Sequence, residues 1–134
     1  MLDLIGKEIL IESFKVVFEK VLDKVYSGYF DTLEKKIKLS EALTAINQAI
    51  LETNKFIKNK GYYENTDLSS LWHEALNKSI AAELKDGLPE FLYHKADFWG
   101  EPKVWLNNQA SMEIVPKLND LKNLCDRIMV RLNK

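Results

Sequence analysis

The chain has 134 residues and a formal net charge of −1, and 46% of its residues are hydrophobic and 29% charged. This length predicts a single domain, residues 1–134, with a core large enough to fold without disulfides or metal ions. The near-zero charge argues against a nucleic-acid-binding protein, and so does the use of lysine for every cation except Arg127 and Arg131.

The single cysteine, Cys125, excludes an intramolecular disulfide and a cysteine-based zinc site. Asp3 stands where a signal peptide carries positive charge, and no small-residue cleavage site follows it. No stretch of the sequence reaches the roughly 18 apolar residues that a membrane span requires. We therefore expect a cytoplasmic protein.

The first predicted helix covers residues 8–30 and has one apolar face. Its apolar residues recur at helical spacing: Leu10, Phe14, Val17, Val21 and Val25. Ser27 and Gly28 weaken the pattern, and Asp31 with Glu34 resembles a capping box. We expect a break or a restart of the helix near residues 28–31.

Two further helices follow in the central part of the chain. The second is expected to begin at Ser40 as its N-cap and to stop at Gly61. A third is expected to run from a cap at Thr66 or Asp67 to Gly87. Their apolar residues at helical spacing include Leu43, Ile46, Ile50, Ile57, Leu68, Leu71, Trp72, Ala75, Leu76, Ile80 and Leu84.

Pro89 suits the first turn of a shorter helix that ends at Gly100. The last helix has the clearest pattern, with apolar residues spaced four, three, four, three and four: Ile114, Leu118, Leu121, Cys125, Ile128 and Leu132. Such a seam packs against antiparallel neighbours. The sequence therefore predicts an all-α fold, an up-and-down antiparallel helical bundle of four main helices with one short extra helix.

The stretch YHKADFWGEPKVW, residues 93–105, attracts attention because it combines a histidine, an aspartate and two tryptophans. On the short helix, Glu90, His94 and Asp97 share one side, as a weak candidate metal site or acid–base face. They lie opposite the apolar side, so we expect them to point into water. Trp99 and Trp105 are then expected to fill the corner between two helices.

Other signals of catalysis are weak. His73 lacks the spacing of carboxylate-bridged metal sites and is expected on the surface, and Cys125 lies in an apolar seam, where a thiol has a raised pKa. Hydrolase elbows, phosphate-binding loops and dinucleotide fingerprints are absent from the sequence. We predict no catalytic residue and no cofactor.

Two lysine-rich stretches, residues 34–38 and 54–60, are the candidates for a nucleic-acid patch. They lie near opposite ends of the predicted second helix, about 30 Å apart at 1.5 Å per residue. Cations that complement helix dipoles explain them without a nucleic acid.

Ile5, Ile9 and Val16 form a second apolar stripe on the first helix, away from its main apolar face. Either the bundle wraps this helix on two sides, or the stripe is an interface with another copy of the chain or another protein. A lipid surface is a weaker alternative, because acidic residues are as common around the stripe as basic ones.

These observations predict a non-enzymatic helical interaction module that self-associates, as a homo-oligomer, or docks on a partner protein. One alternative is a membrane-acting bundle that uses its amphipathic N-terminal helix. A second is a small metal-dependent enzyme, which needs a walled pocket containing Glu90, His94, Asp97 or His73.

Overall fold

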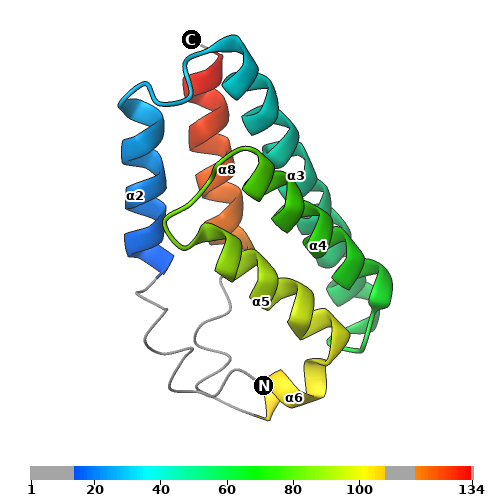
Figure 1. The fold of residues 1–134 in the computed structure, drawn as a ribbon. Coiled ribbons are helices and arrows are strands. Elements are labelled where there is room, and N and C mark those ends of the chain that lie inside the picture. The colour runs from blue at the N-terminus through cyan, green and yellow to red at the C-terminus, as the bar shows by residue number, and fades with distance from the viewer. Residues whose placement is uncertain (1–13, 108–116, 134) are drawn as a thin grey trace.

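The computed structural model describes residues 14–107 and 117–133, which form helices joined by short connections (Figure 1). The helices are α2 (Phe14–Tyr26), α3 (Leu33–Lys60), α4 (Thr66–Ala81), α5 (Leu88–Gly100), α6 (Pro102–Leu106) and α8 (Leu118–Leu132). No strand occurs within these ranges, so the predicted all-α class is confirmed for them. The described part has five helices of 13 to 28 residues and the five-residue α6, one helix more than the sequence predicts there.

The helices close a ring around the core. Helix α4 packs against α3 on one side and against α5 on the other. Helix α2 is the member of the ring that contacts α5 and α8. Consecutive helices are antiparallel neighbours along α3, α4 and α5. Among the described helices, α2 and α3 do not touch, because α8 lies between them (Figure 1).

The start of α3 differs from the prediction. Thr32 is the N-cap, and its hydroxyl accepts a hydrogen bond from the backbone N–H of Lys35 at 3.3 Å. Ser40 is therefore inside the helix, where its carbonyl accepts a hydrogen bond from the Thr44 hydroxyl at 2.9 Å. The predicted cap at Ser40 was wrong because Thr32, earlier in the chain, accepts a hydrogen bond from a backbone N–H group of the first turn.

The end of α4 also differs from the prediction. The helix stops at Ala81 and not at Gly87. Glu83 adopts a left-handed conformation with φ of 62°, and the backbone N–H of Leu84 donates to the Ser79 carbonyl at 3.0 Å. This pattern belongs to a Schellman ending, which usually places glycine at the left-handed position. With glutamate there, the sequence gives no sign of the stop.

Several predicted helix ends are correct or nearly so. Gly61 follows α3 with φ of 83° and donates its N–H to the Ile57 carbonyl. Pro89 lies in the first turn of α5. Asn65, one residue before the predicted Thr66, caps α4 by accepting from the N–H of Leu68 at 3.0 Å.

The predicted seam of α8 faces the core. Leu121, Cys125 and Ile128 are buried, and Leu118 and Leu132 are half-buried. The remaining predicted seam residue, Ile114, lies outside the described residues. This confirms the seam for the part of the helix that the structure describes.

The centre of the core contains a polar contact that the apolar pattern does not reveal. Trp72 of α4 donates its indole N–H to the Thr53 hydroxyl of α3 at 2.9 Å, and both side chains are fully buried. A buried indole N–H that lacks such a partner costs free energy. The bond therefore fixes how α3 and α4 face each other.

Candidate functional site

The sequence predicts that Glu90, His94 and Asp97 point into water, and for His94 this prediction is wrong. The His94 side chain is only 3% exposed, and its ring centroid lies 5.5 Å from that of Trp105. Glu90 is exposed and Asp97 is half-buried. The reason is that α6 packs against α5, so that Trp105 contacts the side of α5 that the sequence pattern left to solvent.

Asp97 has a structural contact at the same corner. Trp105 donates its indole N–H to a carboxylate oxygen of Asp97 at 2.7 Å. Trp99 and Trp105 are both buried, as predicted for side chains that fill the corner between two helices. Within the described residues, no three histidine, cysteine, aspartate or glutamate side chains gather as a metal site requires. The structure thus does not bring Glu90, His94 and Asp97 to a common point.

Lys95 is buried in the middle of the apolar side of α5, and its side chain is 7% exposed. The residues three and four positions away on the same helix are all buried and apolar, namely Phe91, Leu92, Phe98 and Trp99. Removal from water lowers the pKa of the Lys95 amine to about 8. The sequence does contain a signal for this burial, because Lys95 lies at helical spacing between Leu92 and Trp99.

The two other candidates for chemistry lie where the sequence predicts them. His73 is exposed on α4, and its ring contacts Tyr93 of α5 edge-on with centroids 6.2 Å apart. Cys125 is buried, which raises the pKa of its thiol to about 12. A thiol so far from ionisation behaves as a small apolar side chain.

The predicted interface on the first helix is only partly described. Ile5 and Ile9 lie outside the described residues, and Val16 is half-buried. The two alternatives, an interface and a helix wrapped on two sides, therefore both stay predictions. In the part of the chain that the structure describes, no helix is long and apolar enough to cross a membrane.

Helix α3 carries apolar side chains on the side that faces away from the core. Leu33, Ile37 and Leu51 are 75%, 51% and 50% exposed. With Thr44 they fall within about 40° of one another on a helical projection, and we call these four residues the outer stripe. The opposite side of α3 supplies its buried residues: Leu39, Ala42, Leu43, Ile46, Ala49, Ile50 and Thr53.

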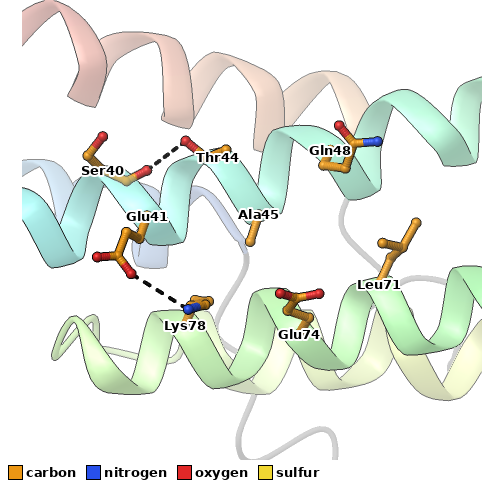
Figure 2. Close-up of a pocket in the computed structure, with 8 residues that line it drawn as sticks. All are labelled: Ser40, Glu41, Thr44, Ala45, Gln48, Leu71, Glu74 and Lys78. Atoms are coloured by element: carbon orange, nitrogen blue, oxygen red, sulfur yellow. Dashed lines mark hydrogen bonds and ion pairs between the residues drawn. The ribbon is translucent and has the colours of Figure 1, made fainter.

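A groove between α3 and α4 has a volume of about 390 Å³. Figure 2 shows the residues of the two helices that line it. Ala45 of α3 and Leu71 of α4 line it with apolar atoms. Glu41 and Lys78 form an ion pair of 3.6 Å across it. Thr44 belongs both to the outer stripe and to the groove, so the two features form one continuous surface.

The outer stripe could not be recognised in the sequence because the predicted start of α3, at Ser40, lies after the observed start at Leu33. A helix that starts at Ser40 excludes Leu33 and Ile37, and Leu51 then stands alone on the solvent side. With the true start at Leu33, the residues Leu33, Ile37, Thr44 and Leu51 are spaced four, seven and seven residues apart. This heptad-like spacing is the signal that could have revealed a second face.

The chain matches no family model, no curated protein and no solved structure. Its role is therefore inferred from its own surface. That surface includes three exposed aliphatic side chains on one side of α3, with Leu33 and Ile37 one turn apart and Leu51 fourteen residues beyond Ile37. Exposed apolar side chains aligned in this way are candidates for association.

Proposed function

We propose that this chain is a non-enzymatic helical interaction module that self-associates or docks on a partner protein. The observation that carries the proposal is the exposure of Leu33, Ile37 and Leu51 on the side of α3 opposite the core. One buried face is enough to hold a helix in a bundle. The outer stripe therefore adds nothing to the fold, but it offers apolar area to a partner.

The surroundings of the outer stripe support the same proposal. Protein interfaces have an apolar centre within a polar rim. Here Glu34 and Lys38, Glu52 and Lys55, and Glu41 and Lys78 form ion pairs along the exposed part of α3, between 3.4 and 3.6 Å. These pairs border the stripe on the flank of α3 that the Glu41–Lys78 pair connects to α4.

The predicted stripe of Ile5, Ile9 and Val16 is a second candidate surface for the same function. The two surfaces can be separated by charge substitutions. Ile5→Lys with Ile9→Lys lowers the oligomeric state if the N-terminal stripe makes the contact. Ile37→Lys with Leu51→Lys lowers it if the outer stripe of α3 does.

A photo-reactive phenylalanine analogue at Leu51, introduced in the native cells, tests the proposal. We expect covalent adducts with a defined protein, which is either this chain itself or a partner. Asn77, exposed on α4, is the matched control position and should give no such adducts. An empty or identical adduct pattern at the two positions contradicts an interaction module that uses α3.

A further inference from the structure

Three of the four residues of the outer stripe are placed symmetrically along the helix, and the fourth, Leu33, has Lys55 at the equivalent position. Ile37 lies seven residues before Thr44, and Leu51 lies seven residues after it. When two identical helices pack antiparallel about a two-fold axis, a residue on one side of the axis faces the residue equally far on the other side. An axis at Thr44 therefore pairs an isoleucine with a leucine twice.

We infer that the partner of the outer stripe is a second copy of this chain, bound through an antiparallel pair of α3 helices with the two-fold axis at Thr44. Ile37 packs on Leu51 of the partner subunit, and Leu51 on Ile37 of the partner subunit. This inference rests on the proposed function and names the occupant of the same surface.

Charge complementarity favours the antiparallel arrangement. Glu34 lies ten residues before Thr44, and Lys55 lies eleven residues after it. Antiparallel packing thus places Glu34 beside Lys55 of the partner subunit, within one residue of ideal register. Parallel packing in register would place Glu34 beside Glu34 of the partner subunit, and like charges there repel.

Both charged groups are accessible to a partner. The Glu34 side chain is 80% exposed and the Lys55 side chain 61% exposed. Each also forms an ion pair within its own helix, at 3.4 Å with Lys38 and at 3.5 Å with Glu52. Exposed pairs of this kind are weak, so each group can also contact an opposite charge on a second chain.

The residues near the proposed axis permit close approach. Ser40 and Thr44 lie on the outward side of α3 at the crossing point. Small side chains there let two helices approach to an interaxial distance of about 8–10 Å. Because the apolar contact consists of a few aliphatic residues per copy, the dimer is weak and concentration-dependent.

Disulfide trapping tests the register directly, in a Cys125→Ala background that removes the native thiol. Thr44→Cys sits on the axis and should link to itself in a glutathione redox buffer. Ile37→Cys and Leu51→Cys should each link poorly alone but should link to each other when the two proteins are mixed. Asn77→Cys, exposed on α4, reports random collision.

We expect the Thr44→Cys protein to form linked dimers about tenfold faster than the Asn77→Cys protein, because association raises the local thiol concentration. Equal rates for these two proteins overturn the inference. Efficient self-linking of Ile37→Cys, with none between Ile37→Cys and Leu51→Cys, also overturns it, because that pattern indicates parallel helices. Circular dichroism checks that every variant stays helical.

The two proposals can fail separately. If photo-crosslinking at Leu51 captures a different protein and Thr44→Cys does not link to itself, the self-pairing inference is wrong and the proposed function stands. If neither experiment gives a product above the Asn77 controls, both are wrong.

Discussion

Replacing Lys95 with methionine should stabilise the protein, because the fold buries an amine among apolar side chains. The pKa of Lys95 falls from 10.5, the value in water, to about 8 in the folded chain. At about 1.4 kcal/mol per pKa unit, keeping this amine protonated inside the fold costs about 3 kcal/mol at pH values below 8. Methionine has a similar length and carries no charge, so it removes most of that cost.

The pH dependence gives the effect a distinctive signature. Between pH 8 and 10.5 the unfolded chain holds the Lys95 proton and the folded chain has lost it. Stability therefore rises with pH in this window, since the unfolded state binds more protons. The advantage of Lys95→Met over the wild type should be largest at pH 7 and should shrink as the pH approaches 10.5.

Urea unfolding followed by circular dichroism measures this difference at several pH values, from about 7 up to the pKa of 10.5 that a lysine has in water. Other lysines and tyrosines titrate in both proteins, so their contributions cancel in the comparison. Lys58→Met, at an exposed position of α3, is the matched control and should change stability little. A Lys95→Met protein no more stable than the wild type at neutral pH would refute the reasoning.

Three further predictions concern the core and its turns, each measured by chemical denaturation. Leu121→Ala should lower the free energy of unfolding by about 2–5 kcal/mol, and a loss below about 0.5 kcal/mol would place α8 outside the core. Thr53→Val should cost about 1–3 kcal/mol by leaving the Trp72 indole N–H unpaired, and the loss should largely vanish in a Trp72→Phe background. Gly87→Ala should lower the free energy of unfolding more than Gly61→Ala. Both glycines have positive φ, but only at Gly87 does an added Cβ meet a valine side chain at 3.0 Å. Equal losses for the two variants would contradict this.

Local signals in the sequence predicted much of the fold. The apolar spacing in α8, the glycine after α3 and the proline in the first turn of α5 each depend on residues close together in the chain. Leu121, Cys125 and Ile128 are therefore where the pattern places them. Such features need no knowledge of tertiary packing.

The end of α4 could not be predicted in this way, because contacts distant in the chain support it. The Lys24 ammonium donates to the Glu83 carbonyl at 3.3 Å, and the Tyr29 hydroxyl donates to the Glu83 carboxylate at 3.1 Å. These bonds from residues far earlier in the chain help to hold Glu83 in a conformation that favours glycine.

The candidate site was harder to predict than the fold. His94 lies on the polar side of α5 by its spacing, and only the packing of α6 brings Trp105 over it. The outer stripe was hidden for a simpler reason, since Thr32 and not Ser40 caps α3. The misplaced start at Ser40 separated Leu33 and Ile37 from Leu51, although the break expected near residues 28–31 is present between α2 and α3.

The central claim is that the outer stripe of α3 is a binding surface for a second copy of the chain. Sedimentation equilibrium over a wide range of protein concentrations tests it most directly. We predict a reversible monomer–dimer equilibrium for the wild type, a monomer for Ile37→Lys with Leu51→Lys, and an unchanged dimer for the control Ile80→Lys with Val104→Lys. A wild type that stays monomeric at every concentration, or a dimer that the Ile37 and Leu51 substitutions leave intact, would contradict the claim.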